Sequence, residues 1–287
     1  MADTQPLPAD THPTAVRLQV SNLQRSLHWY QAIIGCQPLE LTPSSALLGA
    51  RGDAAAPLIE LVERPGARAV RQHARLGLYH FAILLPSRPA LGSFVRRLAA
   101  LDVRVGSADH LVSEALYMHD PDGLGIEVYA DRPRETWTWQ GDQVVMTVDH
   151  LDFRDLARAA VEPWDGLPSG TTIGHVHLHV GDLDQALAFY KAGLGLEETA
   201  RLPGAAFLAA GRYHHHLGIN IWAAAAPSPH EDDAQLLEWS LSVPDKAAAL
   251  AAAERLSHAG HAVQHDADPG RGWTVADPWG TRLRVVP

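Results

Sequence analysis

The sequence predicts an α+β protein made of four βαβββ modules, and two observations carry this prediction. Four segments of alternating hydrophobicity open in the same way, and each is followed by a short turn and an amphipathic helix. Each copy then ends in another alternating segment. One such module makes only half of a curved sheet, so the modules must pair into two curved-sheet, barrel-like halves. The opening strands begin at Ala15, His80, His175 and Glu238, and the closing strands at Leu58, Gly125, Gly218 and Arg282.

The first and third modules share one helix pattern. In the first, a helix is predicted over residues 22–34, with Asn22 as its N-cap and Gly35 directly after its last turn. The third module repeats the pattern from Asp182 to Gly193, with apolar residues at the same spacing. Both helices are therefore expected to pack an equivalent apolar face against a sheet.

The second and fourth modules carry longer helices, predicted over residues 90–101 and 245–259. A proline ends the opening strand before each of them. Their closing strands follow the turns Asp120-Pro-Asp-Gly and Asp277-Pro-Trp-Gly. Asp-Pro favours a turn and glycine tolerates a positive φ, so a hairpin is expected at both places.

The modules group into two domains along the chain. We expect a disordered lead-in over residues 1–13, an N-terminal domain over 14–133 with modules one and two, and a C-terminal domain over 171–287 with modules three and four. Residues 134–170 are predicted to form an ordered connecting arm with a helix near 152–160. Flexible linkers lack large aromatic residues, and this segment holds Trp137, Trp139 and Trp164.

The composition of the chain argues against some classes of partner and compartment. The formal net charge is -10 with Lys and Arg scattered, which argues against a nucleic-acid partner. No apolar run reaches the roughly 18 residues of a membrane span, and the start of the chain does not resemble a secretory signal. The single cysteine, Cys36, fits a reducing compartment. We therefore expect a cytoplasmic protein with no membrane association.

The repeats define a candidate metal site. The first residue of each opening strand and the middle residue of each closing strand form equivalent positions. Pairing modules two and three brings two imidazoles and a carboxylate together, a set that holds Fe(II) with open positions. Pairing one with two would instead give Glu60, His80 and Glu127, with a single imidazole. Pairing modules two and three is favoured because it gathers both imidazoles at one site, and it predicts the metal ligands His80, Glu127 and His175. Modules one and four would then hold Arg284 beside Glu60 and Glu238, a charge-compensated ion cluster.

Other residues are candidates for acid–base catalysis, because an imidazole titrates near neutrality. If the strand entering the third closing segment stays regular, His214 and His216 face the site, whereas a bulge would put His215 there. Tyr117 is expected on a strand adjacent to Glu127, with His110 at the mouth of the site. Phe81 and Trp222 are expected to wall the pocket. The alternative is that the histidines are hydrogen-bonded core residues and Glu127 a surface carboxylate.

The modules at residues 14–133 and 171–287 resemble the vicinal oxygen chelate superfamily, which includes glyoxalase I, the bleomycin-resistance proteins and the type I extradiol dioxygenases. Four stretches look like its catechol-2,3-dioxygenase branch. They are Leu78-Tyr-His-Phe-Ala-Ile-Leu-Leu-Pro, the segment from Asp109 to Tyr129, Gly174-His-Val-His-Leu and Tyr213-His-His-His-Leu-Gly-Ile-Asn. The fourth module departs from the pattern, since Glu238 and Arg284 replace the ligands that many relatives keep in their second half.

This resemblance implies an Fe(II) enzyme, with Mn(II) as the alternative ion, that opens the ring of a small aromatic catechol with O2. It matches the metal ligands to His175, His80 and Glu127, the acid–base histidine to the 214–216 run, and a tyrosine near the metal to Tyr117. Two rivals stay open. One is a glyoxalase-type isomerase or lyase using Glu60, His80 and Glu127 with nickel or zinc. The other is a protein that sequesters a small molecule such as a drug without turnover. Whether the chain forms a homodimer is also left open.

Overall fold

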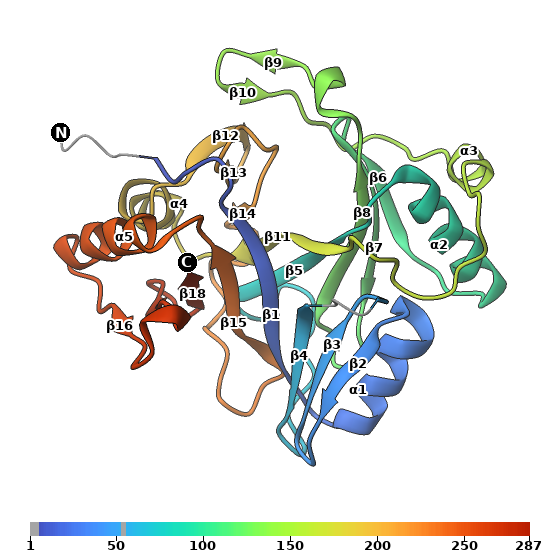
Figure 1. The fold of residues 1–287 in the computed structure, drawn as a ribbon, viewed down its shortest axis with the longest axis horizontal. Coiled ribbons are helices and arrows are strands. Elements are labelled where there is room, and N and C mark those ends of the chain that lie inside the picture. The colour runs from blue at the N-terminus through green and yellow to red at the C-terminus, as the bar shows by residue number, and fades with distance from the viewer. Residues whose placement is uncertain (1–5, 53–55) are drawn as a thin grey trace.

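The computed structural model describes residues 6–52 and 56–287. Within this part of the chain, most strands belong to two curled sheets of eight strands each, which lie against each other (Figure 1). The first sheet has the order β16-β17-β18-β15-β1-β4-β3-β2. Its strands are β1 (His12–Val20), β2 (Gln37–Leu41), β3 (Ser45–Gly49), β4 (Pro57–Glu63), β15 (Gln235–Ser242), β16 (Gln264–His265), β17 (Trp273–Ala276) and β18 (Arg282–Val286).

The second sheet has the order β12-β13-β14-β11-β5-β8-β7-β6 and belongs to modules two and three. Its strands are β5 (Gly77–Leu84), β6 (Gly106–Asp109), β7 (Ser113–His119), β8 (Gly125–Asp131), β11 (Thr172–His179), β12 (Glu197–Leu202), β13 (Ala205–Ala209) and β14 (Leu217–Asn220). Antiparallel pairs join the modules at the centre of each sheet, β5 with β11 and β1 with β15. The predicted α+β class and the pairing of modules two and three, and of one and four, are therefore confirmed.

The helices cover the outer faces of the sheets (Figure 1). In modules one and three each helix begins as an α-helix and widens into a π-helix in its last turn. The N-cap at Asn22 is confirmed, because its side chain accepts a hydrogen bond of 2.8 Å from the backbone of Arg25, and Gly35 ends the helix at φ 84°. The helices are α1 (Leu23–Trp29) with η1 (Tyr30–Ile34), α2 (Arg88–Ala100), α4 (Leu183–Leu187) with η3 (Ala188–Gly193), and α5 (Lys246–His258).

The two sheets are tied together by a tyrosine and an aspartate that recur in both halves of the sequence. Tyr30, on η1 of the first module, donates to Asp120 in the β7–β8 turn at 3.4 Å. In the other half Tyr190 donates to Asp277 at 2.9 Å. All four side chains are buried. Because each pair joins a helix of one sheet to a turn of the other, it fixes how the sheets dock.

The connecting arm (residues 134–170) is ordered, as its tryptophans suggest. Trp137 is buried, and Trp164 packs on Phe94 of α2 with ring centroids 4.9 Å apart. The predicted arm helix is present but shorter than expected. The arm contains η2 (Arg134–Thr136), β9 (Trp139–Gln140), β10 (Gln143–Val144) and α3 (Phe153–Arg158), while η4 (Pro269–Arg271) lies in the fourth module.

The predicted disordered lead-in is wrong for residues 6–13, and residues 1–5 lie outside the described part. Leu7 is buried and its backbone donates a hydrogen bond of 2.8 Å to Gly195, while β1 already begins at His12. The segment is ordered because it inserts an apolar side chain between elements that are themselves packed. Composition alone does not reveal such an anchor.

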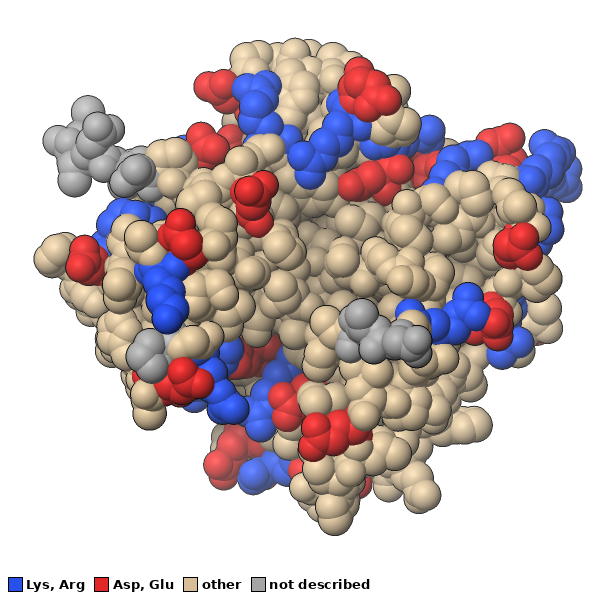
Figure 2. Space-filling model, in the orientation of Figure 1, with Lys and Arg blue, Asp and Glu red and all other residues tan. Residues whose placement is uncertain are grey.

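The first sheet holds charges where the second holds histidines. Arg284 donates to Glu238 at 2.7 Å, as predicted, but Glu60 does not join this pair. It lies 3.2 Å from Arg17, its neighbour across β1 and β4. The expected cluster is therefore divided: Glu60 pairs with Arg17, while Arg284 and Glu238 form a separate group that also includes Asp266 and Arg282. On the face in Figure 2, the coloured acidic and basic side chains are interspersed rather than gathered by sign. Among the described helices, none has the length and apolar character required to cross a bilayer.

Candidate metal centre

Three adjacent strands, in the order β11-β5-β8, bring the predicted ligands together. Ala82 at the centre of β5 lies opposite His175 on one side and Glu127 on the other. His80 precedes Ala82 by two residues and therefore points to the same face. Nε2 of His80 and Nε2 of His175 each lie 3.0 Å from the same carboxylate oxygen, Oε2 of Glu127. One ligand atom from each residue falls within 4.8 Å of the others.

The donor set fits a divalent cation. Nε2 of His80 is buried and, although close to Glu127, is not in hydrogen-bond geometry with any described group. Burial lowers the pKa of His80, which favours the neutral ring that binds metals. Burial also tends to raise the pKa of Glu127, but its electrostatic interactions with the nearby imidazoles of His175 and His80 outweigh this and hold that pKa well below its usual range. The site thus offers two imidazole nitrogens and one carboxylate as donors to a cation.

A chain of hydrogen bonds leads from Asp131 to the site through two histidines. Asp131 Oδ1 lies 3.0 Å from Nε2 of His214, and Nδ1 of His214 lies 2.8 Å from Nδ1 of His215. A carboxylate only accepts, so His214 carries its hydrogen on Nε2 and, when neutral, accepts from His215. His215 then has a free lone pair on Nε2. Its ring lies against that of His175 in a tilted arrangement, with centroids 4.1 Å apart.

Of the two alternatives for the histidine run, regular alternation does not hold, and the irregular backbone that would put His215 at the site is the one found. Residues 213–216 form bends before β14 begins at Leu217, so the backbone irregularity turns His215 toward the site. His214 and His215 line the cavity, whereas His216 accepts a hydrogen bond from the backbone of Ala210 at 3.2 Å and is stacked on Tyr213. His216 therefore has a structural place, away from the cavity wall.

His110 and Tyr117 form a second hydrogen-bonded pair at the cavity. Tyr117 lies directly opposite Glu127 in the β7–β8 ladder, the register expected from the sequence. Nδ1 of His110 lies 2.6 Å from the carbonyl oxygen of Thr147, and its Nε2 lies 2.7 Å from the Tyr117 hydroxyl. Because the carbonyl only accepts, the neutral His110 ring receives the tyrosine hydrogen. The Tyr117 oxygen keeps lone pairs free for a ligand hydroxyl.

These groups surround a cavity of about 410 Å3 on the concave side of the second sheet. His80 and Glu127 line it, and His175 lies buried beside them. Trp222 forms part of the wall as predicted. The prediction for Phe81 is wrong: it points into the core beneath the sheet, because neighbours along a strand alternate between faces and His80 occupies the other one.

Sequence reasoning missed a group of histidines next to the site. His177 and His179 continue the face of β11 that carries His175, and both are buried. The amide of Asn220 connects them, with Nδ2 2.9 Å from His177 and Oδ1 2.6 Å from His179. Burial is the main cause of the lowered pKa of His177. The alternating pattern His175-Val-His-Leu-His already contained the signal, since a period of two places all three imidazoles on one face.

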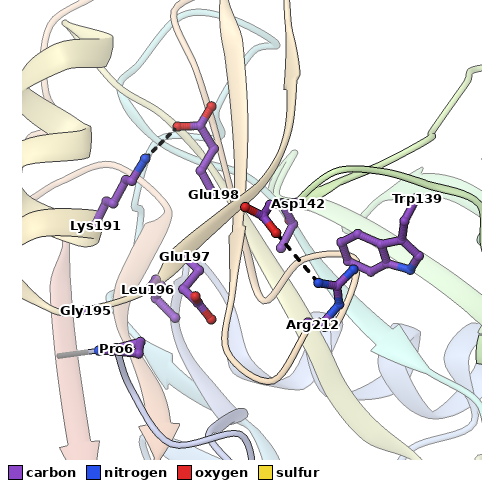
Figure 3. Close-up of a pocket in the computed structure, with 10 residues that line it drawn as sticks. Pro6, Trp139, Asp142, Lys191, Gly195, Leu196, Glu197, Glu198 and Arg212 are labelled. Atoms are coloured by element: carbon purple, nitrogen blue, oxygen red, sulfur yellow. Dashed lines mark hydrogen bonds and ion pairs between the residues drawn. The ribbon is translucent and has the colours of Figure 1, made fainter. Parts of the chain in front are cut away.

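Another cavity, of about 310 Å3, lies near the β9–β10 hairpin and shares no residue with the candidate centre. Figure 3 shows two pairs of its charged side chains facing one another, Lys191 with Glu198 and Arg212 with Asp142. Arg212 also lies over the ring of Trp139. Four of its five charged lining side chains are paired in this way, Glu197 being the exception, and no histidine is among its described lining residues, so the cavity does not have the character of the candidate metal centre.

Comparison with known proteins identifies the class. The model of the Glyoxalase/Bleomycin resistance protein/Dioxygenase superfamily matches residues 12–128 and 172–285, most of the chain. The chain therefore belongs to this superfamily. The match comprises both halves of the sequence, in agreement with the four modules.

One curated relative is similar along almost its whole length. The catechol-2,3-dioxygenase of Bacillus subtilis (strain 168) is 42% identical over 274 residues, covering 94% of each chain. Among solved structures, a proposed dioxygenase from the same species aligns with a TM-score of 0.67 at 13% identity, over 99% of this chain and 86% of that one. Glyoxalase I from Zea mays aligns with a TM-score of 0.56 at 18% identity, over 96% and 92% of the two chains. At these identities the two structures show a shared fold.

Proposed function

We propose that the protein is an Fe(II)-dependent extradiol dioxygenase that cleaves a catechol-type aromatic with O2. One observation carries the proposal: two imidazole nitrogens converge at 3.0 Å on one carboxylate oxygen beside a cavity. The 42% identity to a catechol-2,3-dioxygenase supports it. His80, His175 and Glu127 would hold the ion, with Mn(II) as the alternative. When bound, the ion supplies the Lewis-acid and redox chemistry that the side chains lack.

The surrounding residues bind and deprotonate the substrate. The free lone pair of His215 accepts a hydrogen from one catechol hydroxyl, which makes it the general base. The Tyr117 oxygen accepts a hydrogen bond from a substrate hydroxyl, and His110 holds the tyrosine hydrogen. Burial, followed by the nearby Glu127 carboxylate, raises the pKa of Tyr117 well above its usual range, so this hydroxyl stays protonated. Its role is to orient the substrate rather than to carry charge.

The proposal is tested with His175→Ala and a matched control, Glu60→Ala. The protein is loaded with Fe(II) without oxygen, and oxygen uptake is measured when catechol is added. His175→Ala should lose at least about a hundredfold in uptake and most of its iron. Glu60→Ala should keep both, because Glu60 lies on the other sheet beside Arg17. Circular dichroism checks that both variants fold.

Other outcomes distinguish the alternatives. A wild-type protein that binds iron but takes up no oxygen with any catechol would contradict the dioxygenase and favour a binding protein. If Glu60→Ala lost the metal, the glyoxalase-type ligand set would be favoured instead. Thermal unfolding gives an independent readout: a metal at a hundred times its Kd stabilises by about 2.7 kcal/mol. The rise in Tm on iron loading should be absent in His175→Ala.

A further inference from the structure

The cavity beside the candidate metal centre is far from uniform. Its polar groups gather where His80, Glu127 and the Tyr117–His110 pair meet. Most of the lining surface is nonetheless apolar, and it includes two aromatic side chains and one aliphatic side chain from module three and two side chains from the connecting arm. These residues are Leu202, Phe207, Trp222, Met146 and Val148. A catechol placed with its hydroxyls at the polar end would direct the rest of its ring, and any substituent, toward this apolar wall.

The wall carries no compensating charge. Among the described residues that line the cavity, none is Lys, Arg or Asp, and the single carboxylate is that of Glu127. A substrate carboxylate here would lose water without gaining an ionic partner, which is costly in an apolar environment. It would also meet a chain of net charge -10. The electrostatics therefore select against anionic substituents.

The cavity is also larger than an unsubstituted catechol needs. Its volume of about 410 Å3 is in the range of roughly 300–1,000 Å3 that accepts drug-sized ligands. Two of its apolar residues are partly open to solvent, Trp222 at 48% and Val148 at 74%, so they mark the mouth. Met146 and Leu202 pack against the cluster around buried Trp137, which holds the arm over the wall.

We propose that the preferred substrates are catechols bearing an uncharged, apolar substituent that packs against Phe207, Leu202 and the arm residue Val148. The inference rests on the proposed dioxygenase function and adds the substrate class. Here Val148 is a specificity-determining residue at the mouth, and the connecting arm is part of the substrate site. Because Val148 is exposed, replacing it changes the mouth without disturbing the core.

The test compares two catechols of matched size and different charge. In 4-isobutylcatechol the substituent is a branched alkyl chain, and in 3,4-dihydroxyphenylacetate it has the same number of non-hydrogen atoms but ends in a carboxylate. Oxygen uptake by the iron-loaded protein gives kcat/KM for each. The isobutyl compound should be favoured at least about tenfold, the size of discrimination that apolar contacts give. Equal values, or a preference for the acid, would overturn the inference.

A charge at the mouth should shift this preference. Val148→Lys should raise kcat/KM for the acid about three- to fivefold, the range of an exposed ion pair, through a lower KM. The matched control is Val161→Lys, an equally exposed valine of the same arm, 75% accessible, that does not line this cavity. Both variants change the net charge equally. An equal shift in both would show a general charge effect and would overturn the placement at Val148.

Failure of the inference and failure of the proposed function look different. If unsubstituted catechol is also not cleaved by the iron-loaded protein, the dioxygenase proposal itself fails. If catechol is cleaved and the two substituted compounds do not differ, the dioxygenase stands and the substrate class is wrong. The unsubstituted compound is therefore measured with every variant.

Discussion

At the scale of single residues, the proposed base depends on a carboxylate that does not touch the cavity. Asp131 fixes the hydrogen of His214, and His214 in turn fixes the hydrogen of His215. Without an acceptor at Asp131, the His214 ring is free to reverse its tautomer and to donate toward His215. His215 could then carry its hydrogen on Nε2, and this nitrogen would no longer offer a lone pair to the cavity. Asp131 is thus a positioning residue, with Tyr213 also donating to it at 3.2 Å.

We predict that Asp131→Ala lowers kcat for catechol about tenfold or more, while KM and iron content change little. The expected split arises because the substitution leaves the metal ligands and the cavity wall intact. Asp131→Asn, which keeps an acceptor oxygen, should recover part of the loss. Asp142→Ala is the control, since its side chain is 98% exposed and pairs only loosely with Arg212. A parallel loss of iron in Asp131→Ala would indicate a structural role instead.

Residue-level prediction from the sequence succeeds where periodicity holds and fails where the backbone breaks it. His80, Glu127 and His175 stand at equivalent places in regular strands, so their meeting was predictable. The order of His214, His215 and His216 was not, because the bends before β14 depend on packing. Phe81 follows the same period of two: as the neighbour of His80 along β5, it lies on the opposite face and points into the core.

At the scale of elements, the two Asp-Pro turns carry charge into the interior. Asp120 is 5% exposed and accepts hydrogen bonds from the backbones of Asp122 and Leu124, both at 2.9 Å. Burial raises the pKa of Asp120 to about 7, despite these hydrogen bonds. Burial also raises the pKa of Asp277, its counterpart in the fourth module. The sequence predicted the turns but not their contact with the tyrosines of η1 and η3, which depends on how the sheets dock.

This burial predicts a pH dependence of stability. A raised folded-state pKa means that the native state binds the proton more tightly, so stability is fully present below the unfolded-state pKa near 3.8 and is lost as pH rises toward 7. Asp120→Asn removes this dependence. The free energy of unfolding of the variant should therefore rise relative to wild type between pH 4 and pH 7, by on the order of 4 kcal/mol.

Urea unfolding of the metal-free protein across this pH range measures the effect without interference from metal release. Asp277→Asn provides the matched comparison and should change in the same direction, since its environment is equivalent. Asp142→Asn, at an exposed site, should run parallel to wild type. Parallel curves for Asp120→Asn and wild type would show that Asp120 is ionised at little cost.

At the scale of the whole molecule, the site exists because modules from different halves of the sequence share a sheet. His175 comes from the third module, and His80 and Glu127 from the second, joined through β11 and β5. The sequence could predict this pairing, since only one arrangement gathers two imidazoles around one carboxylate. It could not predict how the arm covers the cavity, because Met146 and Val148 lie in irregular backbone with no periodic signal.

This pairing of modules across the two halves of the sequence predicts how the protein behaves when the chain is cut into two fragments. A cut in the arm between Val161 and Glu162, both exposed, gives fragments 1–161 and 162–287 that keep every described strand intact. In each fragment alone, two strands lose their central partner and have one unpaired edge. These strands are β1 and β5 in the N-terminal fragment and β11 and β15 in the C-terminal fragment. Such open edges favour pairing with another chain. We expect neither fragment alone to bind Fe(II) as the intact chain does, and the co-expressed pair to recover one site.

The decisive measurement is iron content and oxygen uptake for each fragment and for the mixture after co-expression. The N-terminal fragment has one alternative, in which modules one and two pair with each other and bring Glu60, His80 and Glu127 together. That rearrangement would have to break the buried Tyr30–Asp120 contact between the sheets or rebuild it in a new geometry. It would also replace a second imidazole with a carboxylate, a poorer set for Fe(II). Iron binding by this fragment that Glu60→Ala abolishes would therefore contradict the view that pairing across the halves is the stable arrangement.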